Sequence, residues 1–101
     1  MQLHHLEDYR RMMADPVRMN AYQRAIRTTC PGKTVCEVGV GLGPLSLMAL
    51  QSGAERVYGI EVDKDALEMA TAVLNAHGFG PDRFIPIRGI STRVEIPEKV
   101  D

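Results

Sequence analysis

The sequence has little cysteine, no large excess of either charge and no long apolar run. Its two cysteines, Cys30 and Cys36, are too few for a disulfide framework, which favours a reducing compartment. The net charge of -1 comes without a basic patch for nucleic acid, and no segment is apolar and long enough to span a membrane. The histidines and cysteines lack metal-ligand spacing. We therefore predict a cytoplasmic protein, with the nucleus as the alternative compartment, and no metal, nucleic-acid or membrane site.

A short apolar run passes into a glycine-rich loop, and a helical pattern begins directly after that loop. Residues 34–40 are rich in β-branched side chains, which is typical of a buried parallel strand. Gly39, Gly41 and Gly43 then allow a tight turn whose backbone can approach a ligand closely. Pro44 suits the first turn of the helix that follows. The pattern predicts a strand, a ligand-binding turn and a helix, with a glycine turn that binds nothing as the alternative.

The spacing of the glycines indicates which class of ligand the loop binds. A dinucleotide fingerprint, G-x-G-x-x-G, would require glycine at position 44, where the sequence has Pro44. Pro44 also has no N–H group to offer a pyrophosphate at the start of the helix. Glu37 adds a negative charge at the mouth of the loop. These residues favour a cofactor with a cationic amino group over one with two phosphates.

A second apolar run, residues 56–63, ends in acidic residues about twenty positions after the glycine loop. A carboxylate at this place accepts hydrogen bonds from ribose hydroxyls in nucleotide-cofactor sites. Glu61 is the better candidate for that role. Asp63 is the better N-terminal cap for the helix predicted over residues 63–75, with Asp65 as the alternative cap.

Strand, glycine loop, helix and acid-ended strand together resemble class I S-adenosylmethionine-dependent methyltransferases. Residues 9–22 narrow the resemblance to protein arginine methyltransferases, because they are similar to the family signature M-L-x-D-x-x-R followed by a tyrosine. Asp15, Arg18 and Tyr22 match its marked positions. Further segments similar to the family's sequences are residues 32–35, 52–54 and 98–101.

The resemblance implies S-adenosyl-L-methionine as the cofactor and gives several residues a role. The helix that contains Arg18 would fold over the cofactor, and its guanidinium would pair with the methionine carboxylate. A solvated helix charge is the alternative for Arg18. Thr92 is nearest to the position where many members carry a glutamate that meets the adenine amino group. The expected cofactor-binding residues are Arg18, Glu37, Gly39, Gly41, Gly43, Glu61 and Thr92.

The sequence identifies no catalytic residue. In the family, the segment similar to residues 98–101 runs into a fourth strand and then a loop whose two glutamates hold the substrate guanidinium. The sequence shows no counterpart of that loop. We therefore expect the front half of an enzyme, inactive alone and completed by another copy of the chain or by a C-terminal half.

The predicted fold is α/β and Rossmann-like, a partial doubly wound parallel sheet of three strands preceded by an N-terminal helix that ends at about Arg27. We expect residues 1–28 to form a helical segment that caps the cofactor. Residues 29–101 would form the first half of the methyltransferase domain. The third strand, residues 83–90, contains Pro86, which favours the edge of a sheet or a bulge.

Three functions stay open at this point. The first is a protein arginine N-methyltransferase that acts on protein or peptide arginine. The second keeps the cofactor but methylates a small molecule or another peptide group. The third is a module that binds the cofactor or a partner without turnover, and turnover by the chain would exclude it.

Overall fold

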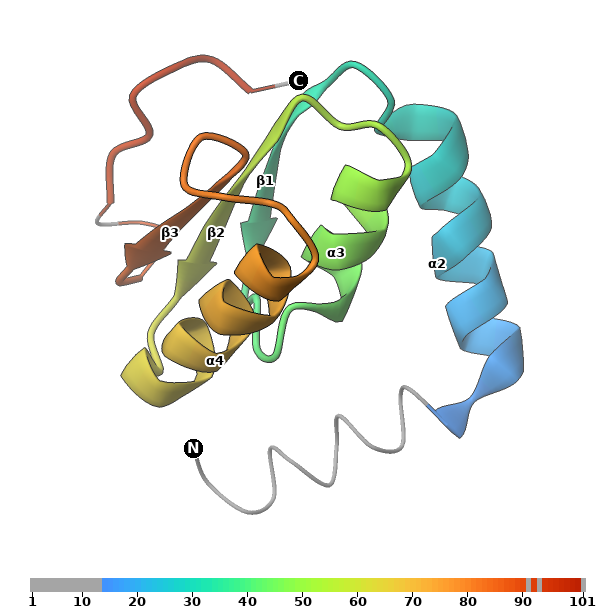
Figure 1. Cartoon of the computed structure of the whole chain (residues 1–101), viewed down its shortest axis with the longest axis horizontal. Helices are drawn as coiled ribbons and strands as arrows, with labels where there is room; N and C mark the ends of the chain where they lie inside the picture. Colours follow the sequence, from blue (N-terminus) through green and yellow to red (C-terminus); the bar gives the residue numbers. More distant parts are fainter. Residues whose placement is uncertain (1–13, 91, 93, 101) are drawn as a thin grey trace.

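The computed structural model describes residues 14–90, 92 and 94–100. The first residues of the predicted signature, 9–13, lie outside this part of the chain. Within it, the elements follow in the order α2 (Pro16–Thr29), β1 (Thr34–Val38), α3 (Pro44–Gln51), β2 (Arg56–Glu61), α4 (Lys64–Ala76) and β3 (Phe84–Arg88) (Figure 1).

The three strands form one parallel sheet in the order β1-β2-β3, which confirms the predicted class of fold. Val35, Val57 and Phe84 are Cα partners across it. Pro86 lies on β3, which among the described residues pairs with β2 alone. This pairing confirms the prediction of an edge position for the proline-containing strand. Such a position suits proline, because an edge strand loses least from the missing N–H group.

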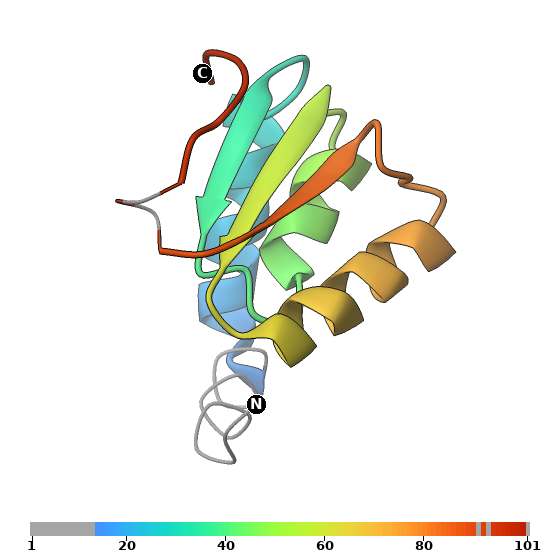
Figure 2. The same cartoon turned by 90° about the vertical axis from the view of Figure 1, so that its left-hand side faces the viewer.

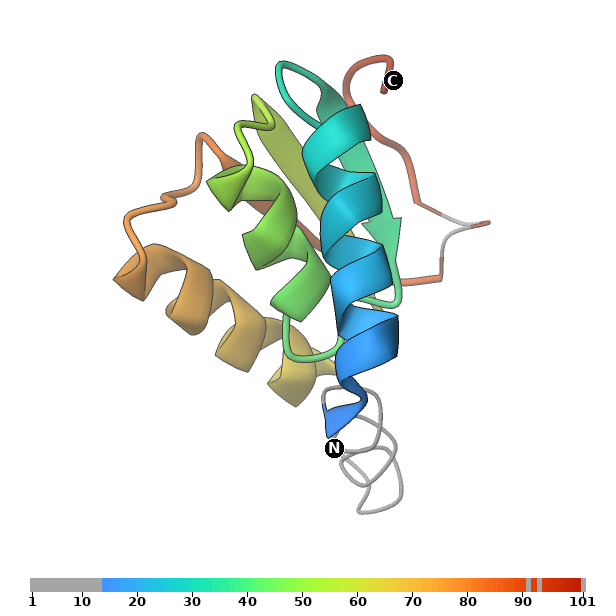
Figure 3. The same ribbon diagram turned by 90° about the vertical axis from the view of Figure 1, so that its right-hand side faces the viewer.

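All three helices pack on one face of the sheet, as views from two opposite sides show (Figures 2 and 3). The core between them is apolar and is built around Val40, Leu50, Val57, Leu74 and Phe84. The opposite face carries the C-terminal segment (Figure 2). There the hydroxyl of Tyr58 donates to Glu98 Oε2 at 2.5 Å, and Arg56 Nη1 donates to the same carboxylate at 2.9 Å.

The first strand differs from its prediction in length and in burial. We predicted a buried strand over residues 34–40, whereas β1 ends at Val38, because Gly39 leaves the extended conformation with a φ of 74°. Thr34 is buried, but Val38 is 62% exposed. The physical reason is that helices cover one face of the sheet and that β1 lies at its edge.

The helix ends follow ordinary capping chemistry. Asp15 Oδ1 accepts hydrogen bonds from the amides of Val17 and Arg18 at 3.1 and 3.2 Å, so α2 begins immediately after this aspartate. The helix continues to Thr29, two residues beyond the predicted end near Arg27. At the start of α4, Asp63 Oδ1 accepts from the amide of Ala66 at 3.0 Å, which confirms Asp63 as the cap.

Candidate cofactor site

The carboxyl ends of the parallel strands meet on one side of the molecule, where the arrowheads of β1 and β2 point in Figure 1. A cavity of about 170 Å³ lies there. Its lining comes from all three strand ends: Val38, Gly39, Ile60, Glu61, Val62, Gly89 and Ile90. Open α/β sheets bind ligands at this edge, and two of the predicted site residues, Gly39 and Glu61, line the cavity.

The three glycines of the loop after β1 donate their amides to acceptors within the chain. The amide of Gly39 donates to the carbonyl of Ile60 at 2.8 Å, and that of Gly43 donates to the carbonyl of Val40 at 3.0 Å. The amide of Gly41 donates to Glu61 Oε1 at 2.7 Å. Pro44 follows as the first residue of α3 and has no N–H group. A pyrophosphate would have to displace these bonds, so the loop is unsuited to a dinucleotide.

The glycines of this loop face different surroundings. All three have positive φ, at 74° for Gly39, 58° for Gly41 and 88° for Gly43. A Cβ atom on Gly39 would meet nothing within 4 Å, so this residue borders open space. A Cβ atom on Gly43 would lie 3.0 Å from Leu74 Cδ2 and 3.1 Å from Ala70 Cβ. Gly43 therefore fits the loop against α4, while Gly39 faces the cavity.

Glu61 joins the end of β2 to the glycine loop. Its Oε1 accepts from the amide of Gly41, and its Oε2 accepts from the amide of Asp63 at 3.0 Å. A carboxylate offers about four lone-pair positions, so each oxygen can accept one more hydrogen. Glu61 is thus held in place by the backbone and can still receive the two hydroxyls of a ribose.

Glu37 lies on β1 and faces α3, where its Oε1 accepts a hydrogen bond from the hydroxyl of Ser46. It lines a second cavity of about 200 Å³ beneath α2. Burial is the main cause that raises the pKa of Glu37 to about 7, and the charge of Glu61 adds to it, while Ser46 opposes it. Among the described residues, Glu37 forms no ion pair. A cationic group would therefore be well placed here.

Arg18 lies in the first turn of α2, which contains no acidic residue. A cation is unfavourable at this positive end of a helix, so the position is not explained by helix stability. The N-terminal end of α2 lies on the same side of the molecule as the carboxyl ends of the strands (Figures 1 and 3). Arg18 is exposed, and Tyr22, one turn further along, lines the cavity beneath α2. Thr92 is exposed and lies two residues beyond Ile90.

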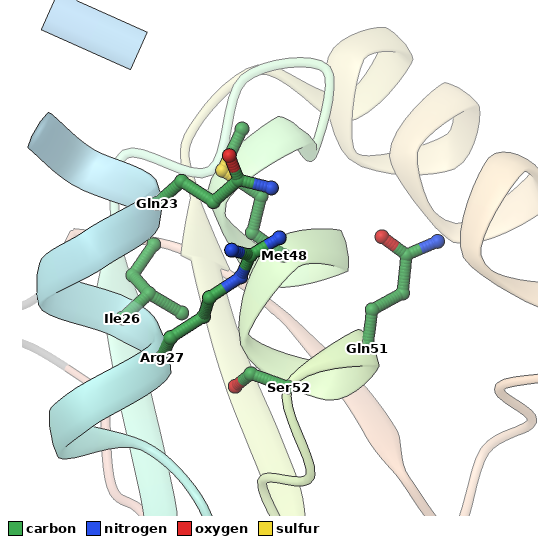
Figure 4. A pocket seen from close by; sticks show the side chains of 6 residues that line it. All are labelled: Gln23, Ile26, Arg27, Met48, Gln51 and Ser52. Carbon is green, nitrogen blue, oxygen red and sulfur yellow. The ribbon is translucent and has the colours of Figure 1, made fainter. Parts of the chain in front are cut away.

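A smaller cavity of about 110 Å³ lies between α2 and α3. Figure 4 shows Gln23 and Arg27 on α2 reaching toward Met48 on α3, with Ser52 beyond. Ser52 follows the last residue of α3, whereas the glycine loop precedes the first. This cavity is therefore separate from the strand ends.

The described residues contain no group of three or more histidine, cysteine, aspartate or glutamate side chains that could hold a metal ion. No helix in residues 14–90 or in the described positions beyond them has the length and apolar character needed to cross a bilayer.

Comparison with known proteins shows which proteins the chain is similar to. No family model matches the chain. The chain is 37% identical over 100 residues to the histone-arginine methyltransferase CARMER of Anopheles gambiae. This match covers 96% of this chain and 16% of that protein. It also matches the crystal structure of Arabidopsis thaliana protein arginine methyltransferase 10 with a TM-score of 0.83 and 36% identity, over 99% of this chain and 28% of that one. The chain is homologous to a part of the protein arginine methyltransferases.

A second similar structure is that of an arginine methyltransferase in complex with a ligand. The Trypanosoma brucei PRMT1 enzyme–prozyme heterotetrameric complex with AdoHcy matches with a TM-score of 0.79 and 30% identity, over 89% of this chain and 29% of that one. The chain thus spans less than a third of the length of each arginine methyltransferase compared, and it corresponds to a Rossmann-like segment of them.

Homology to arginine methyltransferases does not by itself name the residues that line this site, and several were missed by the sequence analysis. Val38 ends β1, Val62 directly follows β2, and Gly89 and Ile90 are the first two residues after β3; all four line the cavity at the strand ends. Their signal in the sequence is position alone, because each lies within two residues of the end of a strand. Ser46 was missed because a buried serine in an apolar helix carries no motif of its own.

Proposed function

We propose that this chain is the S-adenosylmethionine-binding part of a protein arginine N-methyltransferase. The observation that carries the proposal is the pair of carboxylates at the strand ends, one held by backbone amides and one half-buried without an ion-pair partner among the described residues. The homology to arginine methyltransferases supports the same reading. The cofactor unites a ribose with an ammonium group, which are the two groups these carboxylates suit.

The residues present fit the cofactor at each end. Glu61 would accept hydrogen bonds from the ribose hydroxyls, because its two oxygens keep free lone pairs. Glu37 would face the ammonium group, and Arg18 would pair with the carboxylate of the methionine part. Gly39 leaves room for the ligand to approach the backbone. Ile90 and Thr92 would border the adenine, which suits the apolar side chain of Ile90 at 47% exposure.

S-adenosylmethionine, when bound, supplies an electrophilic methyl group on a sulfonium. This chain's own residues bind and orient the donor, and orientation accounts for much of the rate in such transfers. Glu37 and Glu61 are the acid pair that the described residues place at the strand ends, and the cofactor would use both. Neither would then be left to hold a substrate guanidinium. We therefore propose that the acceptor, an arginine in a protein or peptide, is held by groups outside this segment. We also propose that residues 1–28 cap the cofactor and residues 29–101 form the binding domain.

Isothermal titration of the chain with S-adenosylhomocysteine, with NAD⁺ as the comparison ligand, tests the proposal. We expect saturable binding of S-adenosylhomocysteine and none of NAD⁺, because the amides of the three loop glycines are already bonded and Pro44 has no N–H group. Arg18→Ala should weaken binding about tenfold or more through the lost charge-assisted pair, whereas Arg24→Ala on the same helix should not. Binding of NAD⁺ alone, or equal effects of the two variants, would contradict the proposal.

A further inference from the structure

Ser46 is a buried polar residue whose single donor hydrogen is committed to Glu37. Its side chain is 1% exposed, and its hydroxyl donates to Glu37 Oε1. Ser46 is the third residue of α3, a helix whose N-cap, Gly43, offers no side-chain bond. Both the hydroxyl and the backbone amide of Ser46 favour the ionised form of the Glu37 carboxylate. Without the Ser46 hydroxyl, the partly buried carboxylate would lose a hydrogen bond that stabilises its charge.

The other titratable groups around Glu37 give it no positive charge. Glu61 on β2 repels its carboxylate, and the charge of Glu37 in turn helps to raise the pKa of the adjacent Cys36. From α2, Tyr22 and Cys30 line the same cavity of about 200 Å³. Neither side chain can be a cation. Among the described residues, support for the ionised form of Glu37 therefore comes from Ser46.

We propose that Ser46 is a positioning residue for cofactor binding, which keeps the Glu37 carboxylate ionised and oriented toward the ammonium group of S-adenosylmethionine. The inference rests on the function proposed above and adds to it. Ser46 does not itself contact the ammonium group. It acts through Glu37, so its effect on binding must follow the ionisation of that carboxylate.

The effect of Ser46 on ligand binding should therefore vary with pH. The pKa of Glu37 is raised to about 7, so its ionised fraction changes across the neutral range. Ser46→Ala removes a donor that lowers this pKa, so the pKa should rise further. For a rise of about one unit, binding to the ionised form alone should weaken about ninefold at pH 6 and about twofold at pH 8 relative to the unchanged chain. The ratio at each pH cancels any titration of the ligand itself.

The experiment combines two measurements on the 101-residue chain. Isothermal titration with S-adenosylhomocysteine from pH 6 to pH 8.5 gives the ratio of dissociation constants for Ser46→Ala. Carbon NMR of the side-chain carboxyl carbons gives the pKa of Glu37 without ligand. Ser52→Ala is the matched control, because the Ser52 hydroxyl donates to the carbonyl of Ala49 at the other end of α3. Ser46→Thr keeps the hydroxyl and should restore the original pH profile.

The outcomes separate the proposal from the function on which it rests. A raised pKa of Glu37 in Ser46→Ala, together with a binding ratio that falls toward one with rising pH, supports the proposal. In a Glu37→Gln background, Ser46→Ala should then have little further effect on binding. An unchanged pKa, or a ratio that is constant with pH, would overturn the role of Ser46 even if the ligand binds. Absence of binding by the unchanged chain would overturn the proposed function, and the NMR titration would still show whether Ser46 controls Glu37.

Discussion

Glu61 Oε1 accepts a hydrogen bond from the backbone amide of Gly41 at 2.7 Å, and this bond joins the acidic end of β2 to the middle of the glycine loop. The same carboxylate accepts the amide of Asp63, the residue that caps α4. One side chain therefore fixes the loop, the strand end and the start of the next helix. The geometry that would receive a ribose is built into the chain before any ligand arrives.

Replacing Glu61 by glutamine should affect both stability and binding. Glutamine has one acceptor oxygen, so one of the two amides loses its partner, and the side-chain NH₂ faces an N–H group. We expect a loss of about 1–2 kcal/mol in the free energy of unfolding and binding of S-adenosylhomocysteine weakened at least about tenfold. Urea unfolding and isothermal titration measure the two effects. Glu68→Gln removes the same charge from an exposed side chain on α4 and should change stability by less than about 0.5 kcal/mol.

Gly43→Ala should destabilise the chain by packing as well as by strain. The new Cβ atom would lie 3.0 Å from Leu74 Cδ2, at a φ of 88° that disfavours alanine. Gly78 has a φ of 90° and open space around a Cβ atom, so Gly78→Ala isolates the strain. We expect a loss of about 1 kcal/mol for Gly78→Ala and about 2–4 kcal/mol for Gly43→Ala in urea unfolding. Equal losses would show that α4 does not pack closely on the loop.

Glu37 should make the chain less stable as the pH rises. Its pKa is raised from 4.5 to about 7 in the folded chain, so the folded state binds the proton more tightly than the unfolded state. Stability is therefore greatest, as far as Glu37 is concerned, below about pH 4.5 and is lost as the pH rises toward 7. Glu37→Gln should remove a loss of about 1–3 kcal/mol between pH 5 and pH 8, measured by urea unfolding at both values. Glu95→Gln, at an exposed position, serves as the control, and equal slopes for Glu37→Gln and the unchanged chain would contradict the assigned burial.

Much of the fold could be predicted because local patterns agree with the tertiary structure. The acid-ended second strand, the cap at Asp63 and the edge position of the strand with Pro86 all depend on short-range chemistry. The half-burial of β1 could not be predicted, since it depends on which face of the sheet the helices cover. The pairing of Tyr58 and Arg56 with Glu98 also depends on long-range packing, and no spacing rule joins these positions.

The candidate site, too, could be predicted only in part from the sequence. The placement of Gly39 and Glu61 at the strand ends could be predicted, because a strand, a loop and an acid at fixed distances are typical of a nucleotide-cofactor site. Ser46 could not, because its importance comes from one hydrogen bond to a carboxylate on another element. The different roles of Gly39 and Gly43 likewise appear only when the neighbouring α4 is placed.

Amide chemical-shift mapping of the chain with S-adenosylhomocysteine tests the proposed cofactor site most directly. We predict saturable shifts that cluster at the strand ends, at the amides of Gly39, Gly41, Gly89 and Ile90, with little change at Gly78. Shifts confined to the cavity between α2 and α3, around Gln23 and Met48, would place the ligand elsewhere and contradict the proposed site. The absence of any shift at saturating ligand would contradict it equally.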